Sequence, residues 1–352
     1  MCHHSKSLPR VRGADGLRPQ IATMLPMATM PRSIFRTLFS FRVAAALLMT
    51  LAVAPAAAGY KEGVLSYRNG ELARAVKELL PVAKAGNPEA QILLAQILMN
   101  GGKGVTKDQR EGLVWVRRSA EGGNRDAQVF LAKTLTRGTY GATIDLAAAA
   151  HWYSKAAQAG DERAMRALAR IHLEGSGTPK DPAAAVPWLR KLAAAGDRSA
   201  ETQLGVLALR GEGVPKDPAV AAGHFSVATK AGDDGAAFML AQLHGRGLGV
   251  ALDAKESLRL LRLAATAGNF NAMAMLANTL ANGGDGVERD DEEAYKWLTI
   301  VLNRVPQGDL FFSAAAMELQ LRQRLSAQRI ERAQVEASRF VAQPMTPAAA
   351  GK

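Results

Sequence analysis

Residues 195–225 read AGDRSAETQLGVLALRGEGVPKDPAVAAGHF and contain one helix–turn–helix unit that the chain repeats. A phrase close to A-x-A-G-[ND] opens each unit, and its glycine recurs at steps of 37, 37, 36, 36 and 36 residues. Such a period is typical of solenoids, in which each unit packs only on its neighbours. The six glycines are Gly86, Gly123, Gly160, Gly196, Gly232 and Gly268.

A leucine and an alanine four residues before it occupy fixed positions in every unit. Residues at i and i+4 share one face of a helix, so the pair predicts the buried face of a first helix. A small residue follows each leucine and lets neighbouring helices approach closely. The leucines are Leu94, Leu131, Leu168, Leu204, Leu240 and Leu276.

The linker that follows predicts where the first helix ends and the second begins. Seven residues after each leucine stands a glycine, which suits a left-handed helix end, and the linker closes with an aspartate suited to capping the next helix. All four tryptophans occupy one position of the second helix, where we expect them to be packing plugs: Trp115, Trp152, Trp188 and Trp297.

These phrases resemble the Sel1-like repeat family, which is related to tetratricopeptide repeats. The A-x-x-x-L-[GA] phrase, the G-x-G-V-x-K-D turn and the W-[YFL] pair carry the resemblance, which covers residues 87 to about 304. It implies an all-α fold, an α/α solenoid wound as a right-handed superhelix, that acts as an adaptor in protein complexes. Some exported members are cysteine-rich, a feature that this chain does not share.

The repeat sets the predicted domain boundaries. Six repeats are expected over residues 87–305, preceded by a capping helix pair at 59–86 and followed by a capping helix at 306–340, with a long amphipathic helix from 311. Residues 341–352 are rich in proline and alanine and are predicted to be a disordered tail.

The N-terminal region predicts export. Residues 30–58 combine a basic stretch, the apolar run VAAALLMTLAVA and Ala56-Ala57-Ala58, which together indicate a signal peptide cleaved before Gly59. The run of twelve apolar residues from Val43 is too short to span a bilayer, so no stable membrane insertion is expected. Residues 1–29 are either an unstructured extension or a misassigned start, with Met24, Met27 and Met30 as other initiators. The expected location is periplasmic or secreted.

Charge and motif content argue against nucleic acid binding and catalysis. Seven basic residues and one acidic residue precede Gly59, so half of the net charge of +12 lies in the leader. The single cysteine, Cys2, also lies there. The sequence contains no H-E-x-x-H, P-loop, G-x-S-x-G or S-x-x-K motif. We therefore expect no enzyme activity, no cofactor and no metal.

Helix geometry nominates a partner-binding face on the first helices. Positions two residues before and after each leucine rotate by about 200° from it, and a further turn extends the same face. In the middle repeats these positions form an interrupted basic stripe, which is either solvated surface or a groove that favours acidic peptides. The nominated residues are Gln96, Asn100, Lys133, Arg137, Arg166, Arg170, Arg210, Phe238, Gln242, Arg246 and Asn278.

The sequence therefore predicts an exported interaction scaffold that binds a protein or an extended peptide in the groove of the solenoid. The alternative is a cell-wall-acting or β-lactam-inactivating enzyme built on the same repeats. A third interpretation is a purely structural role, in which the chain stiffens an assembly.

Overall fold

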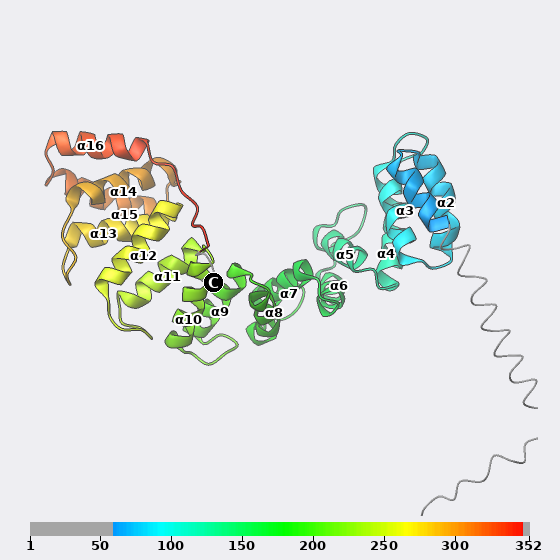
Figure 1. Cartoon of the computed structure of the whole chain (residues 1–352), viewed down its shortest axis with the longest axis horizontal. Coiled ribbons are helices and arrows are strands. Elements are labelled where there is room, and N and C mark those ends of the chain that lie inside the picture. Colours follow the sequence, from blue (N-terminus) through cyan, green and yellow to red (C-terminus); the bar gives the residue numbers. More distant parts are fainter. Residues whose placement is uncertain (1–58, 348–352) are drawn as a thin grey trace, which may run out of the picture. The chain divides into compact units, whose positions relative to one another are not determined.

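The computed structural model describes residues 59–347, so the predictions for residues 1–29 and 30–58 and for the cleavage site fall outside the described residues. The described part is a succession of helix pairs (Figure 1). Each helix of the six repeats packs on the one before and the one after it along the chain, which confirms the predicted all-α solenoid. No helix within residues 59–347 combines the length and apolar character needed to cross a bilayer.

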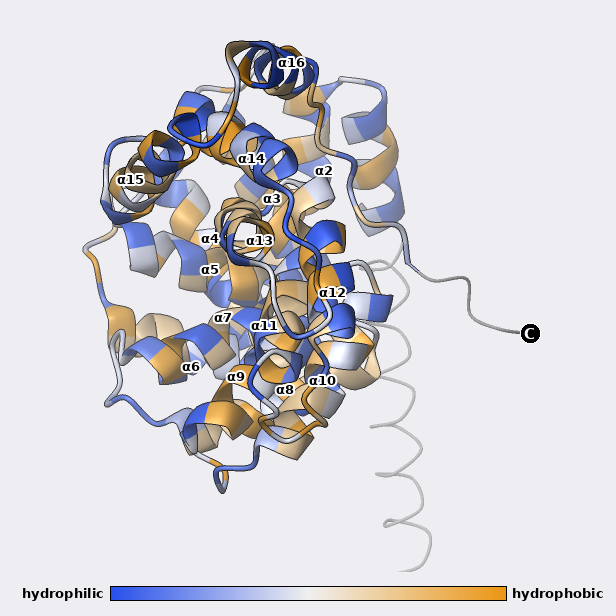
Figure 2. Cartoon of the chain, turned by 90° about the vertical axis from the view of Figure 1, so that its left-hand side faces the viewer, coloured by the Kyte–Doolittle hydropathy of each residue, from blue (hydrophilic) through white to orange (hydrophobic). Residues whose placement is uncertain are grey.

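Six repeats each supply a first and a second helix. The first helices are α3 (Pro88–Asn100), α5 (Arg125–Arg137), α7 (Glu162–Glu174), α9 (Arg198–Arg210), α11 (Asp234–His244) and α13 (Phe270–Asn282). The second helices are α4 (Gln109–Glu121), α6 (Leu146–Gln158), α8 (Pro182–Ala194), α10 (Pro218–Lys230), α12 (Ala254–Ala267) and α14 (Asp291–Arg304). Hydrophobic and hydrophilic residues alternate around these helices, as amphipathic packing requires (Figure 2).

Side-chain caps define the start of every repeat helix. The aspartate that closes each linker accepts a backbone N–H of the second helix, as predicted, at Asp108, Asp145, Asp181, Asp217, Asp253 and Asp290. The residue after each repeat glycine caps the first helix in the same way. These caps satisfy N–H groups that a helix leaves unpaired, so the short helices begin at fixed residues.

Glycines with a left-handed backbone make the turns between helices. The six repeat glycines have φ between 87° and 106°. One predicted helix end is wrong by two residues: Gly247 predicts an end at Arg246, but α11 stops at His244, and Gly247 lies in the loop with φ 62°. Gly245 stands in the expected last turn, where the lack of a side chain makes continued helix less favourable.

The alanine and leucine of each first helix lie in a continuous core. None of the six leucines is more than 7% exposed, and the alanines are almost completely buried. Val129, expected on the open face two residues before Leu131, is instead buried at 2% exposure. The equivalent positions of the other repeats are half-buried or exposed, so the burial of this position is particular to α5.

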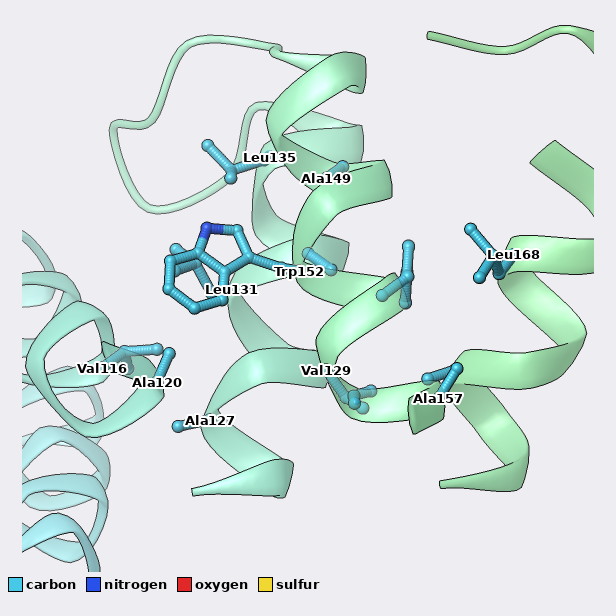
Figure 3. Close-up of a cluster of buried hydrophobic side chains, with 14 of the residues drawn as sticks. Val116, Ala120, Ala127, Val129, Leu131, Leu135, Ala149, Trp152, Ala157 and Leu168 are labelled. Carbon is cyan, nitrogen blue, oxygen red and sulfur yellow. The ribbon is translucent and has the colours of Figure 1, made fainter. Parts of the chain in front are cut away.

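The tryptophan position is structural, as predicted. Trp152 lies among Leu131, Leu135 and Ala149 in the core (Figure 3), and Lys155 places its ammonium 4.7 Å from the centroid of the indole ring. In the fourth repeat, His224 takes this position and bonds to Glu201 at 2.7 Å. Trp188 is only half-buried, in contrast to the other three tryptophans.

Both ends of the repeat array carry additional helices. Residues 59–68 form a helix that precedes α2 (Leu72–Lys84), with Gly70 in the turn between them at φ 76°. At the other end, the single helix expected from residue 311 is wrong. Two helices are present, α15 (Asp309–Arg322) and α16 (Ala327–Ser338), because Ser326 caps a new helix after a turn. Both helices pack on α14 and cover the last repeat.

The described part of the predicted disordered tail is also wrong, since residues 341–347 lie against the repeats. The chain leaves α16 and runs as an extended segment past α12 towards α10 (Figure 1). The Gln343 N–H donates to the Thr266 carbonyl at 2.9 Å. The local composition predicted disorder, but a contact with a residue far away in the sequence, Thr266, holds this segment against the repeats.

Candidate functional site

Two adjoining cavities lie along the first helices of the first three repeats. The first has a volume of about 450 Å³ and the second about 250 Å³, and Lys133 and Arg163 line both. The first is bounded by α3 and α5, by Val116 and Arg163, and by Tyr140 from the α5–α6 loop; the second is bounded by α5, α6 and α7. We call the two together the N-terminal cavities.

Apolar side chains form much of the first cavity. Ile92 and Met99 contribute from α3, and Val129 and Phe130 contribute from α5. The ring centroids of Phe130 and Tyr140 are 5.5 Å apart. Such a lining accepts an aromatic or branched aliphatic side chain, in a volume within the common range for ligand pockets.

Tyr140 adopts an unfavourable backbone conformation at this cavity. Its φ is 57°, one of two positive values for a non-glycine residue within residues 59–347. This conformation costs a bulky residue about 1–2 kcal/mol and often marks a functional site. The tyrosine ring lies at the cavity wall against Phe130, a feature that the repeat pattern does not predict.

Three cations at the cavities have no ion-pair partner among residues 59–347. Lys133, Arg137 and Arg170 are exposed and line the second cavity, and Lys133 also lines the first. Burial raises the pKa of the Tyr153 phenol beside them, while a hydrogen bond to Thr136 and the charges of Arg170 and Arg137 act in the opposite direction. The surface here therefore carries uncompensated positive charge.

Arg166 also lines the second cavity, but its charge is already balanced. Its guanidinium lies 2.5 Å from Asp197 and 3.1 Å from Glu162. Asp197 caps α9, so the ion pair joins α7 to the next repeat. The structure thus gives this predicted site residue a role in holding two repeats together.

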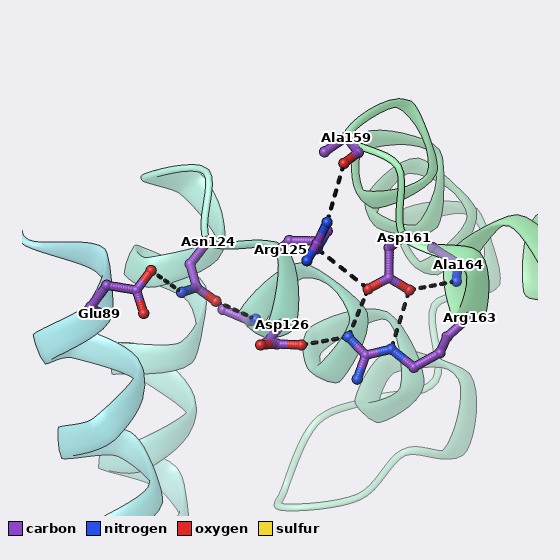
Figure 4. Close-up of polar contacts among 9 residues, drawn as sticks. Glu89, Asn124, Arg125, Asp126, Ala159, Asp161, Arg163 and Ala164 are labelled. Atoms are coloured by element: carbon purple, nitrogen blue, oxygen red, sulfur yellow. Dashed lines mark hydrogen bonds and ion pairs between the residues drawn. The ribbon is translucent and has the colours of Figure 1, made fainter.

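A polar network beside the cavities fixes the starts of the first helices (Figure 4). Arg163 pairs with Asp126 and with Asp161, the latter at 2.6 Å, while Asn124 donates to Glu89 at 2.8 Å. Burial raises the pKa of the Asp161 carboxyl, but hydrogen bonds from Arg163 and the Ala164 N–H outweigh it, so that the pKa lies below its usual value. Within the described residues, the ion pairs of Asp126 and Asp161 are therefore with arginines of this network and not with Lys133, Arg137 or Arg170.

The eleven predicted site residues do not form one site. Six of them line the N-terminal cavities: Gln96, Asn100, Lys133, Arg137, Arg166 and Arg170. The other five, which lie on α9, α11 and α13 or directly after α11, line neither cavity: Arg210, Phe238, Gln242, Arg246 and Asn278. Sequence reasoning missed Phe130, Tyr140 and Arg163. The departure of the GTYGATID linker from the common turn was an available signal for Tyr140 alone.

Metal ions require groups of ligating side chains placed close together. Within residues 59–347, no group of three or more histidine, cysteine, aspartate or glutamate side chains is placed to hold a metal ion. The His224–Glu201 pair joins α10 to α9 at the tryptophan position of the repeat. The apolar walls of the first cavity and the cations of the second are suited to binding through shape and charge.

Comparison with known proteins agrees with this geometry. The Sel1 repeat family matches residues 88–124, 125–161, 162–197, 198–233, 235–269 and 271–300, and the chain belongs to this family. Sel1 repeat proteins generally mediate protein–protein interactions and are generally not enzymes. No curated protein matches the chain significantly.

Two solved structures share the fold. The c5321 protein, a protective antigen present in uropathogenic Escherichia coli strains and displaying an SLR fold, is 29% identical with a TM-score of 0.64. The match covers 81% of this chain and 60% of c5321, so this chain spans three fifths of that protein's length. A Sel1 repeat protein from Oxalobacter formigenes is 29% identical with a TM-score of 0.51, over 71% of this chain and 99% of that one.

Proposed function

We propose that this chain is an exported scaffold that binds an extended acidic segment of a partner protein in the N-terminal cavities. The observation that carries the proposal is the cluster of Lys133, Arg137 and Arg170, which have no ion-pair partner within the described residues and lie beside an apolar cavity. Unpaired cations on a surface attract acidic ligands and increase the rate of encounter.

The two cavities favour a ligand of mixed character. The apolar walls of the first cavity accept one large apolar side chain, since its volume of about 450 Å³ exceeds that of any single residue. The cations of the second cavity favour aspartate or glutamate a few residues away. An acidic peptide with one aromatic anchor combines both features.

Charge reversal tests the proposal. A fluorescently labelled acidic decapeptide that contains one phenylalanine serves as the probe in fluorescence anisotropy, with a lysine-rich decapeptide as its counterpart. We expect Lys133→Glu with Arg170→Glu to weaken binding of the acidic peptide by about tenfold or more, as for lost close charge pairs. Binding by the unaltered protein should fall as salt rises.

Arg246→Glu provides a matched control, because Arg246 has the same repeat position as Arg137 but lines neither cavity. Equal weakening by the control would indicate a general charge effect and would contradict the proposed site. Binding of both peptides alike would contradict the preference for acidic segments.

The proposal that the protein is exported depends on the signal-peptide pattern of residues 30–58, and a separate experiment tests it. We expect expression of the full chain in a Gram-negative host to yield periplasmic protein whose N-terminal residue, by Edman sequencing, is Gly59. Retention of the leader on cytoplasmic protein would contradict this part of the proposal.

A further inference from the structure

A second surface of the solenoid is occupied by the chain's own C-terminal segment. Residues 340–346 lie in extended form across α14, α12 and the end of α10, all of which are second helices of repeats. The N-terminal cavities are formed mainly by first helices and lie elsewhere in the fold. We call the surface beneath the segment the tail track.

Phe340 is the first anchor of the segment. Its ring meets the Trp297 indole edge to face, with centroids 5.5 Å apart. Arg304 places its guanidinium 5.3 Å from the centre of the Phe340 ring and donates to the Phe340 carbonyl at 2.6 Å. An aromatic ring, a cation and a main-chain hydrogen bond together recognise both the side chain and the backbone at this position.

Glycine turns of the repeats receive the rest of the segment. A Cβ added to Gly268 would lie 3.1 Å from the Cβ of Ala342, and one added to Gly232 would lie 2.7 Å from the Met345 carbonyl oxygen. Between these points the Gln343 N–H donates to the Thr266 carbonyl, the last turn of α12. The tail track thus binds an extended backbone in two ways. The Thr266 carbonyl accepts a main-chain hydrogen bond, and the turns at Gly232 and Gly268 leave room for the segment because they lack side chains.

Some side chains of the segment are half-buried on the track and others are exposed to solvent. Phe340, Ala342 and Met345 are half-buried, while Val341 is 74% exposed and Gln343 and Pro344 are also exposed. The inward pattern is an aromatic residue, a small residue two positions later and a flexible apolar residue three positions after that. Contacts of such inward-facing side chains with the receiving surface are the usual basis of specificity when an extended peptide is bound.

The segment does not fill the track. Cavities of about 420 and 380 Å³ remain between it and the helices, the first beside Trp297 and Phe340 and the second beside Leu263 and Met345. A segment with larger inward side chains would make more contacts than the chain's own residues. A competing ligand therefore has room to bind more tightly than the tail does.

We propose that the tail track is a binding site for an extended segment of a partner protein with this inward pattern, and that residues 340–346 occupy it in cis until the partner displaces them. The segment follows α16 directly, so its effective concentration at the track is in the millimolar range or above. Occupancy in cis raises the apparent Kd of any competing segment. The proposal is independent of the N-terminal cavities.

Two opening variants test the proposal in the full protein. The probe is a fluorescently labelled peptide, RFVAQPMTP, which has the sequence of residues 339–347. Phe340→Ala removes the aromatic anchor, and Ala342→Glu places a larger charged side chain against Gly268. We expect both variants to bind the probe at least about tenfold more tightly than the wild type does, since each weakens the competing segment. Val341→Ala, at an exposed position, is the matched control and should behave as the wild type.

Several outcomes would overturn the proposal. The first is absence of binding to both opening variants when their far-UV circular dichroism is unchanged. The second is equal binding to the wild type and the opening variants, since the tail would then not occupy the track. Dimerisation of the wild type in sedimentation velocity, lost in Phe340→Ala, would assign the track to a second copy of the chain and not to a different partner. Lys133→Glu with Arg170→Glu should leave probe binding unchanged, so the two proposals can fail separately.

Discussion

Repeat turns can need glycine for two reasons: a left-handed backbone and a close approach of neighbouring chain. Gly196 has only the first, whereas Gly213 has both. Gly213 has φ 72° and Gly196 has φ 88°, both in the left-handed region. A Cβ on Gly213 would lie 2.5 Å from the backbone at Pro182 and Ala183, whereas a Cβ on Gly196 would have no neighbour within 4 Å. Alanine at either position introduces backbone strain, but only alanine at Gly213 also forces two repeats apart.

The expected costs differ accordingly. Left-handed strain alone costs about 1–2 kcal/mol, and this is the whole loss expected for Gly196→Ala. Overpacking against backbone adds about 1–3 kcal/mol, so Gly213→Ala should lose about 2–5 kcal/mol. The difference between the two variants measures the close approach of the α9–α10 loop to the start of α8.

Urea unfolding followed by far-UV circular dichroism measures both losses by linear extrapolation. Gly249→Ala is a second test of the same contact type, since its Cβ would lie 2.2 Å from the carbonyl carbon of Pro218. Equal losses for Gly213→Ala and Gly196→Ala would refute the reasoning, because they would show that the loop moves away at no cost.

Three further predictions concern the core, a cap and pH. Trp152→Ala should destabilise the protein by about 3–5 kcal/mol, and Trp188→Ala by less, because Trp188 is only half-buried. Thermal unfolding of the two variants measures both losses. Equal losses would show that burial is not the cause of the difference in stability. Asp145→Ala should cost about 1 kcal/mol in urea unfolding by removing the cap of α6, and Asp145→Asn should restore most of it. The folded-state pKa of Asp161 is lowered, so its contribution to stability is present above the unfolded value of about 4 and is lost as the pH falls through the folded value. Asp161→Asn keeps a capping side chain but loses the ion pair with Arg163, so its deficit at pH 7 should shrink below about pH 4; a deficit that is constant with pH would show that the charge does not contribute.

The repeat was predictable because its determinants are local and recur. The steps between Gly86 and Gly268 set the length of each unit, and the Asp caps and glycine turns set where helices start and stop. The burial of Leu131 and Trp152 followed from helix periodicity. Each of these features depends on residues within one unit, so a single sequence contains the information several times over.

The candidate site was predictable only in part. Helix rotation placed Lys133, Arg137 and Arg170 on an exposed face, which the structure agrees with. It did not show that Arg166 is paired with Asp197 in the next repeat or that Val129 is buried. These outcomes depend on the distance and tilt between neighbouring repeats, which the period of the sequence does not specify.

The sequence by itself determined the class of fold, the number of repeats and the helix ends within them except that of α11, since these follow from local propensity and spacing. Only the tertiary structure decided that Phe130 and Tyr140 form a cavity and that Phe340 lies on Trp297. It also decided the break between α15 and α16 and the course of residues 341–347 along α12. The physical reason is that these contacts join residues of different elements through burial and single hydrogen bonds, and such contacts leave no periodic signal in the chain.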